Sequence, residues 1–146
     1  MIELISFQHE EFKDCILDID KLLDAHADEV EDMYITPNYD VYQAGDEQDA
    51  LRIYTMRNGE ELVGYSAFWL MNHPHHDGKI FAANDLVYIR PEHRGEMAMK
   101  FFEYVERQLE GVDAITYTFK VEHDHPELME YLGMTHTEKV YTKVLG

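Results

Sequence analysis

The middle of the chain restricts the fold most strongly, because its hydrophobic pattern has the period of β-strands. Residues 50–57 and 61–71 alternate with period two, and the Asn58-Gly59 pair between them is a strong signal for a tight hairpin turn. The second segment is apolar on both faces, which is typical of a central strand. Another strand follows at 80–90 and ends before a proline. We therefore expect three consecutive antiparallel strands at the centre of a sheet.

Before these strands, the hydrophobic pattern has the period of a helix. Apolar residues recur at helical spacing over 9–26, which predicts an amphipathic helix, and a short strand is expected before it at 2–6. A shorter helical piece at 27–34 follows. The segment 35–49 contains proline, asparagine and glycine without a clear period, so we expect it to be a loop.

The second half of the chain alternates helices with strands. Residues 95–110 carry one apolar stripe and are followed by Gly111, a typical helix C-cap residue. A strand at 113–120, a short helix at 126–133 and a final strand at 135–145 come next. Because the first of these helices joins two strands as a crossover, those strands should be parallel. The sequence thus predicts an α/β (α+β) fold with a mixed, mostly antiparallel sheet flanked by helices.

Size and composition limit the class of protein further. A chain of 146 residues is expected to form a single domain, 1–146, and 45% hydrophobic residues suffice for a core. Cys15 is the one cysteine, so no internal disulfide is expected, which fits a reducing cytosol and a cytoplasmic location. The first residues, MIELISFQHEEF, lack the basic start of a secretory signal. No apolar run approaches the length of a membrane span, so we expect no membrane partner.

The charge is strongly negative and unevenly distributed. The formal net charge is −18, and residues 1–49 contribute −13 of it through fifteen acids and two lysines. Such a surface repels phosphates, so we expect no duplex nucleic acid as a partner. It favours a cationic ligand, a basic partner protein or mimicry of a polyanion, while a solvated acidic helix face is the alternative.

The junction at 85–100, DLVYIRPEHRGEMAMK, carries the clearest chemical signal. A strand ends at Pro91, and Arg94-Gly95 opens a helix. Unpaired N–H groups at a helix N-terminus bind phosphate, and Arg94 would add a charged contact. On these residues alone, an ordinary turn glycine between a strand and a helix explains the pattern equally.

The element order, the string YIRPEHRG before a helix and LMEYLGM before a last strand resemble the GCN5-related N-acetyltransferase (GNAT) family. The resemblance covers nearly the whole chain and is strongest from about residue 80 onward. Within the family, the chain is most similar to acetyltransferase-like proteins of tailed bacteriophages. The resemblance implies that acetyl-CoA lies where two parallel strands splay apart, with its pyrophosphate on the next helix N-terminus. The residues it implies for the cofactor are Val87, Ile89, His93, Arg94, Gly95, Glu96, Met97 and Ala98.

Two departures from the family pattern affect the expected chemistry. The pattern that begins at Arg94 has small residues where Met97 and Met99 stand here, and a thioether occupies space that a phosphate would use. The family's usual tyrosine, which protonates the departing thiolate, is replaced by Met129. Tyr131 is two residues on, which puts it on another helix face.

Aminolysis of a thioester needs a base for the amine and a proton donor for the sulfur. Asp85, beside Asn84 on the strand at 80–90, is the better candidate base, and a purely structural polar residue is an equal alternative. Tyr88 or Tyr117 would serve as the acid, and the spacing does not select between them. Main-chain N–H groups near Val87 and Ile89 would polarise the thioester carbonyl.

Two functions remain open. The first is a GNAT-type N-acetyltransferase that uses acetyl-CoA and acts on a small amine or a protein lysine. The second is a catalytically weakened relative that binds a host protein through its acidic N-terminal third, including Asp18, Glu29, Glu31 and Asp32. A homodimer is compatible with both.

The histidines at 73–76 are compatible with two interpretations, a metal site and a turn between strands. His73, His75, His76 and Asp77 lie within five positions. Because zinc sites usually take ligands from separate elements, we interpret this cluster as a turn between strands and expect no metal.

Overall fold

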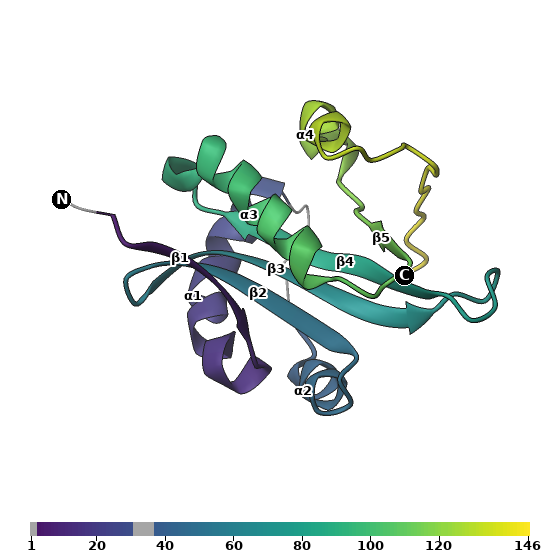
Figure 1. Cartoon of the computed structure of the whole chain (residues 1–146), viewed down its shortest axis with the longest axis horizontal. Coiled ribbons are helices and arrows are strands. Elements are labelled where there is room, and N and C mark those ends of the chain that lie inside the picture. The colour runs from purple at the N-terminus through teal and green to yellow at the C-terminus, as the bar shows by residue number, and fades with distance from the viewer. Residues whose placement is uncertain (1–2, 31–36) are drawn as a thin grey trace.

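The computed structural model describes residues 3–30 and 37–146, and it has a five-stranded sheet with helices on both faces (Figure 1). The strands are, in spatial order, β1 (Ile5–Glu10), β2 (Leu51–Asn58), β3 (Glu61–Asn72), β4 (Ile80–Ile89) and β5 (Ala114–Thr116). Neighbouring strands are antiparallel except for β4 and β5, which are parallel. The predicted mixed, mostly antiparallel α+β fold is therefore confirmed.

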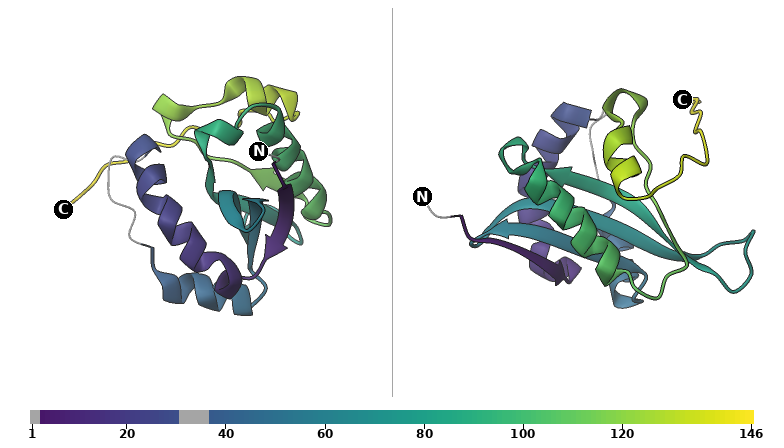
Figure 2. Two further views of the ribbon diagram at one scale, coloured as in Figure 1. Left: turned by 90° about the vertical axis from the view of Figure 1, so that its left-hand side faces the viewer. Right: turned by 45° about the horizontal axis from the view of Figure 1, so that its top comes forward.

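The helices divide between the two faces of the sheet, as Figure 2 shows. Helices α1 (Phe12–Val30) and α2 (Tyr39–Glu47) cover one face, and α3 (Glu96–Gln108) covers the other. The short helix α4 (Pro126–Tyr131) follows β5. The core beneath α1 and α2 includes Phe12, Cys15, Leu22, Ile53 and Tyr65. The core beneath α3 includes Met56, Phe68, Phe101, Phe102 and Val105.

The central strands form as their local sequence predicts. Asn58 pairs with Glu61 across the turn between β2 and β3, and Gly59 has a φ of 63°, which L-residues with side chains rarely adopt. Strand β3 is buried along most of its length, in agreement with its apolar pattern on both faces. Helix α3 and helix α4 also lie within the predicted ranges.

The N-terminal elements are shifted along the chain relative to their predicted positions. Strand β1 spans Ile5–Glu10 rather than 2–6, and residues 1–2 of that prediction lie outside the described residues. Helix α1 begins at Phe12 and continues to Val30 as one element. The separate helical piece predicted at 27–34 is therefore wrong up to residue 30, and its remainder lies outside the described residues. The pairing of β1 with β2 decides this register, which local periodicity does not determine.

The loop predicted at 35–49 is wrong over most of its length, because α2 forms there. The Asn38 side chain caps the helix by accepting a hydrogen bond from the Val41 N–H. Gly45, which lowers helix propensity, is buried against Trp69 of β3. Packing against the sheet therefore stabilises a helix that its sequence alone does not favour. Residues 35–36 lie outside the described residues.

The predicted final strand at 135–145 is not formed, and β5 is much shorter than the predicted strand at 113–120. Residues 134–146 contain neither helix nor strand, and the side chains of Val140, Tyr141, Val144 and Leu145 are largely exposed. Alternating β-branched residues favour a strand only when a neighbouring edge supplies hydrogen bonds. Within the described part of the chain, no helix combines the length and apolarity that crossing a bilayer requires.

Candidate active site

The parallel strands β4 and β5 separate after three residue pairs. Phe81, Ala82 and Ala83 pair with residues 114–116, and β4 then continues to Ile89 while β5 ends. A cleft of about 820 Å³ lies along the freed edge of β4, between Asn84 and Ile89 on one side and residues 118–121 on the other. This volume is typical of a small-molecule site. The expected splayed pair is thus present.

Main-chain groups of β4 point into this cleft in an alternating pattern. The Arg90 N–H donates to the Val63 carbonyl of β3 across 2.8 Å. In an antiparallel ladder, every second residue bonds to the same neighbour, so Val87 and Ile89 direct their backbone groups to the opposite edge. Both residues line the cleft.

A β-bulge interrupts β4 beside the cleft. Ala67 pairs with Leu86 and Phe68 with Asn84, which leaves Asp85 as the extra residue. The Asn84 side-chain amide lies 3.2 Å from the Ala67 carbonyl and 3.3 Å from the Leu86 carbonyl, so it bridges the bulge. The bulge turns Asp85 out of the regular ladder at the end of the cleft.

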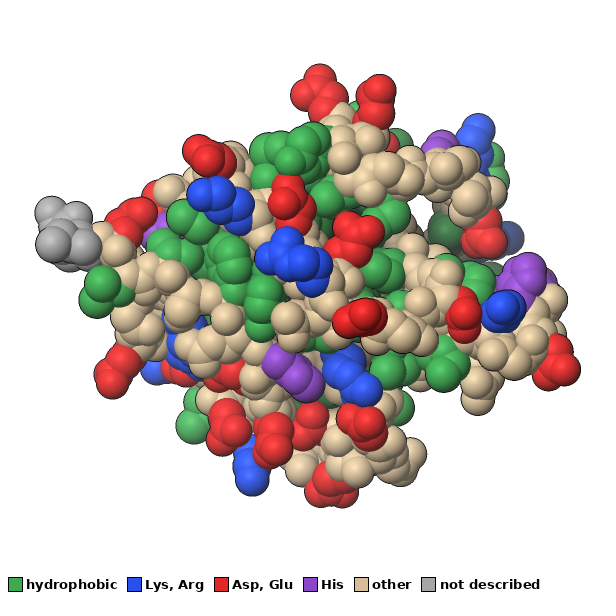
Figure 3. Space-filling model, in the orientation of Figure 1, with side chains coloured by type: hydrophobic (Ala, Val, Ile, Leu, Met, Phe, Trp, Pro, Cys, Tyr) green, Lys and Arg blue, Asp and Glu red, His purple; other side chains and the backbone are tan. Residues whose placement is uncertain are grey.

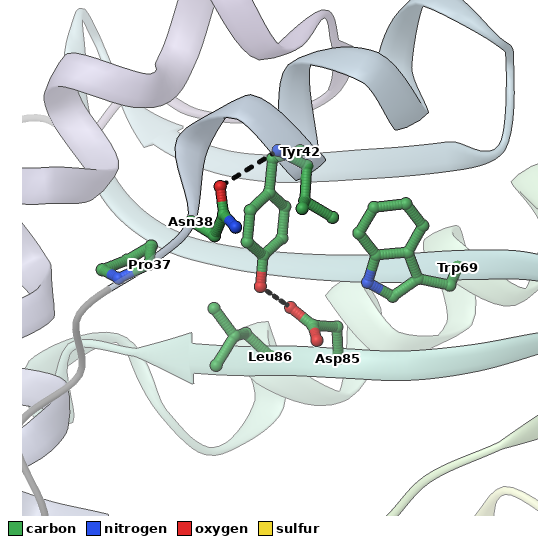
Figure 4. A pocket seen from close by; sticks show the side chains of 7 residues that line it. Pro37, Asn38, Tyr42, Trp69, Asp85 and Leu86 are labelled. Carbon is green, nitrogen blue, oxygen red and sulfur yellow. Dashed lines mark hydrogen bonds between the residues drawn. The ribbon is translucent and has the colours of Figure 1, made fainter.

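Asp85 is held by an aromatic residue of α2. The Tyr42 hydroxyl donates a hydrogen bond of 2.5 Å to Asp85 Oδ2, as Figure 4 shows. Burial and this hydrogen bond both raise the pKa of Tyr42, so its hydroxyl keeps its proton at neutral pH. The carboxylate remains exposed and lines the cleft.

The N-terminus of α3 opens onto the same cleft. Gly95 adopts a φ of 93° and a ψ of −132°, a conformation that L side chains rarely adopt. The first N–H groups of a helix have no intrahelical partner. No side chain in the described residues caps those of α3, so they remain open to a ligand. Gly95, Ala98 and Met99 line the cleft at this point. The arrangement suits an anionic group.

Arg94 is already engaged at the mouth of the cleft. Its Nε donates to the Ile89 carbonyl across 2.8 Å, and its Nη2 lies 2.6 Å from Glu29 Oε2 of α1. The guanidinium also lies over the ring of Tyr88, 5.6 Å from its centroid. A second anion at this position must therefore compete with the Glu29 carboxylate.

Solved structures share this fold over nearly their whole length. A ribosomal-protein-alanine N-acetyltransferase from Brucella melitensis is 18% identical, with a TM-score of 0.75 and coverage of 98% of this chain and 99% of that one. Glucosamine-6-phosphate N-acetyltransferase from Arabidopsis thaliana is 13% identical, with a TM-score of 0.71 and coverage of 99% and 100%. The chain has the GNAT fold.

A further GNAT-fold structure, a predicted acetyltransferase from Clostridium acetobutylicum solved with acetyl-CoA, is 14% identical, with a TM-score of 0.69 and coverage of 97% of this chain and 96% of that one. At the level of sequence, no protein-family model and no curated protein matches the chain. The narrower resemblance to phage proteins stays a prediction.

Only some of the residues expected to hold the cofactor lie along the cleft. The cleft is lined by Val87, Ile89, Arg94, Gly95 and Ala98, and its lining does not include His93, Glu96 or Met97. His93 is buried near Glu3, and Met97 packs against the core beneath α3. Of the two methionines at positions expected to be small, Met99 alone therefore narrows the cleft.

The two candidate acids lie in different surroundings. Tyr88 lines the cleft and stacks on His26 with ring centroids 5.1 Å apart, and burial, followed by the nearby Glu29 carboxylate, raises the pKa of Tyr88. Tyr117 packs edge-on against Phe68 in the core beneath α3 and is not part of the cleft lining. Of the two tyrosines only Tyr88 lines the cleft, and the role of either one as an acid stays a prediction.

The sequence pattern did not indicate that Tyr131 lines the cleft. Met129 packs against the core beneath α3, whereas Tyr131 lines the cleft and donates a hydrogen bond of 2.7 Å to Glu103 Oε1. This hydrogen bond raises the pKa of Tyr131. Helical spacing separates the two residues as expected, but the placement of α4 decides which of them faces the cleft.

His26 is a second residue that the sequence pattern did not single out as functional. It belongs to the apolar stripe of α1 and is only 4% exposed, yet it lines the cleft. A distance of 2.7 Å separates His26 Nδ1 from the Tyr65 hydroxyl oxygen. Burial on an apolar helix face is the usual sign of a core residue, so the sequence held no signal for this position.

The histidines at 73–76 form part of the turn between β3 and β4. The rings of His73 and His76 pack on Phe81, with centroids 4.5 Å and 5.6 Å from it. Within residues 3–30 and 37–146, no group of three histidine, cysteine, aspartate or glutamate side chains is arranged to hold a metal ion.

Proposed function

We propose that the protein is an N-acetyltransferase that uses acetyl-CoA and acetylates an amine. The observation that carries this proposal is the cleft between β4 and β5, which ends at the uncapped N-terminus of α3. One GNAT-fold structure similar to this chain was solved with acetyl-CoA, and two others are named as N-acetyltransferases of a ribosomal protein and of an amino sugar phosphate. These likenesses support a protein or a small amine as the acceptor.

The residues of the cleft fit such a cofactor. The N–H groups at the start of α3, with Arg94, would hold its pyrophosphate, and the outward backbone groups of Val87 with the N–H of Ile89 would hold its pantetheine arm, since the Ile89 carbonyl already accepts from Arg94. When bound, acetyl-CoA supplies the activated acetyl thioester.

The chain's own groups then have separate roles in the proposed reaction. Asp85 accepts a proton from the amine, because its carboxylate is exposed at the end of the cleft and fixed by Tyr42. The backbone N–H groups of β4 are donors for a carbonyl oxygen at the strand edge. Tyr88 retains a hydroxyl proton that can be donated to a leaving group, and Tyr131 can do so only after its hydroxyl leaves Glu103.

Isothermal titration calorimetry with acetyl-CoA tests the proposal. We expect saturable binding at micromolar cofactor, together with acetyl transfer to at least one member of a panel of primary amines. Absence of binding at millimolar acetyl-CoA would overturn the proposed function.

A protein-binding role is the second candidate, and two observations favour it. Met99 lines the cleft, and Glu29 already neutralises Arg94. Both features weaken the cleft as a cofactor site.

The docking face proposed for that role, the acidic N-terminal third, already uses some of its side chains for contacts within the molecule. Asp18 Oδ2 accepts a hydrogen bond of 3.1 Å from Arg57, while Glu31 and Asp32 lie outside the described residues. Acidic side chains gather along the lower margin of the view in Figure 3.

The pair of Arg94 and Glu29 gives a prediction for cofactor affinity. Arg94→Ala should weaken acetyl-CoA binding by about 1–3 kcal/mol, the usual loss for a charge-assisted contact. Glu29→Gln should strengthen it about two- to tenfold, because it removes the carboxylate that competes for the guanidinium. Calorimetry on both variants measures these changes. Equal affinity in Arg94→Ala and the wild type would place the pyrophosphate elsewhere.

A further inference from the structure

A second hollow lies beneath helix α2, next to the cleft at Asp85 and Leu86. It has a volume of about 460 Å³ (Figure 4). It is lined by Pro37, Asn38, Val41, Tyr42, Trp69, Asp85 and Leu86. Apolar and aromatic side chains therefore form most of its wall, and among the described residues that line it Asp85 alone carries a formal charge.

The aromatic wall is held by tight packing. A Cβ atom on Gly45 would lie 2.3 Å from Trp69 Cζ3, so the missing side chain is what lets the indole contact α2. The rings of Tyr42 and Trp69 have centroids 5.5 Å apart and an interplanar angle of 41°. Tyr42 also stacks on Phe12 of α1, at 6.4 Å and 8°. The two rings thus form a preorganised corner.

The charge of this corner suits a cation. Asp85 Oδ2 accepts the hydrogen bond from Tyr42, and within the described part of the chain its carboxylate accepts no other hydrogen bond, so Oδ1 is available to a ligand. A carboxylate beside aromatic faces binds an ammonium group by charge-assisted hydrogen bonds and cation–π attraction. Acidic residues of α1 and α2, such as Asp20, Asp40 and Asp46, add negative charge to the helices on this face and attract cations to it.

The hollow and the cleft share a boundary. Asp85 and Leu86 line both, so the two spaces meet at the bulge of β4. A group bound at the Asp85 carboxylate is therefore next to the end of the cleft. This position is what an acceptor amine needs if the thioester lies along β4.

We propose that this hollow is the acceptor subsite and that it selects a primary ammonium on an unbranched alkyl stem. The ammonium binds Asp85, and the stem packs on Tyr42 and Trp69. The inference rests on the proposed function. In the reaction the amine nitrogen forms a bond to the acetyl carbon while the carbon–sulfur bond breaks. One ammonium proton passes to Asp85, and a second ends on the sulfur of the thiol product.

Trp69 provides a direct test because it is the one tryptophan in the chain. Its fluorescence is titrated with n-butylamine, Nα-acetyl-lysine amide, glucosamine and n-butanol in the absence of acetyl-CoA. We expect saturable changes with the first two probes and weaker or no saturation with the sugar and the alcohol. The first two probes distinguish a free alkylamine from a lysine side chain as the source of the same chemistry.

Matched variants sharpen the test. Asp85→Asn should weaken amine binding about tenfold or more, because it removes the charge that pairs with the ammonium. Asp40→Asn makes the same charge change at an exposed position of α2 outside the hollow, and it should alter the affinity less than about twofold. Gly45→Ala should shift the fluorescence of Trp69 and weaken binding, because the added Cβ displaces the indole.

The outcomes separate this inference from the proposed function. Saturable amine binding at Trp69 without any acetyl-CoA binding would overturn the acetyltransferase and, with it, the role of the hollow as an acceptor subsite, and would leave an amine-binding site. Acetyl transfer with no amine-dependent fluorescence change, or with equal responses to n-butylamine and n-butanol, would overturn the subsite alone. Equal losses in Asp85→Asn and Asp40→Asn would also overturn it, because the general charge of the surface would then explain the binding.

Discussion

Asp85→Asn is expected to lower the kcat of acetyl transfer by about 10²–10⁴-fold at saturating amine, the usual contribution of a positioned general base. The amide keeps the size of the side chain and still accepts a hydrogen bond from Tyr42, but it does not take a proton from the amine. Steady-state kinetics on the purified variant measures the effect. Acetyl-CoA affinity should remain close to that of the wild type, because Asp85 is not among the groups proposed to hold the pyrophosphate or the pantetheine arm.

Tyr42→Phe is the matched control for this prediction. It removes the hydrogen bond to Asp85 but retains the ring that packs on Trp69, so we expect a loss of only about three- to tenfold in kcat. A rate for Asp85→Asn within about threefold of the wild type would exclude Asp85 as the base. His26, which also lines the cleft, would then be the next residue to substitute.

Arg57→Met is expected to lower the free energy of unfolding by about 3–5 kcal/mol, because it leaves a buried carboxylate without its charged partner. Two guanidinium nitrogens of Arg57 each lie 2.9 Å from a Glu10 oxygen, and a third donates to Asp18. The side chains of Arg57 and Glu10 are each 11% exposed. Thr55 also donates to Glu10, which completes the polar cluster between β1 and β2. Urea denaturation measures the change.

Two further variants test the cause of this loss. Arg52→Met removes an arginine from the same strand, but its partner Asp49 is 85% exposed, so the cost should stay below about 1 kcal/mol. Adding Glu10→Gln to Arg57→Met should recover part of the stability, because no buried charge remains unpaired. A cost for Arg57→Met no larger than that for Arg52→Met would show that the cluster is not stabilising.

Local sequence was sufficient for the elements whose structure depends on near neighbours. The β2–β3 hairpin follows from Asn58 and Gly59, because a turn needing positive φ is specified by the residues within it. The start of α3 follows from Gly95 for the same reason. Helix α2 did not follow, because Gly45 is unfavourable in a helix until Trp69 packs against it. The final strand did not form, because an alternating pattern becomes a strand only by pairing, and in the described structure residues 134–146 do not pair with β5, the edge strand of the sheet.

The same distinction between local sequence and tertiary packing applies to the candidate site. The sequence by itself determined that a helix begins after Arg94-Gly95, and it predicted an anion site there, since N–H groups at a helix start are unpaired in any context. Tertiary structure alone decided which side chains meet there. Tyr42 and Asp85 are 43 residues apart, and Arg94 and Glu29 are 65 apart. Such pairs depend on how helices pack across a sheet, and no periodicity within one element encodes that packing.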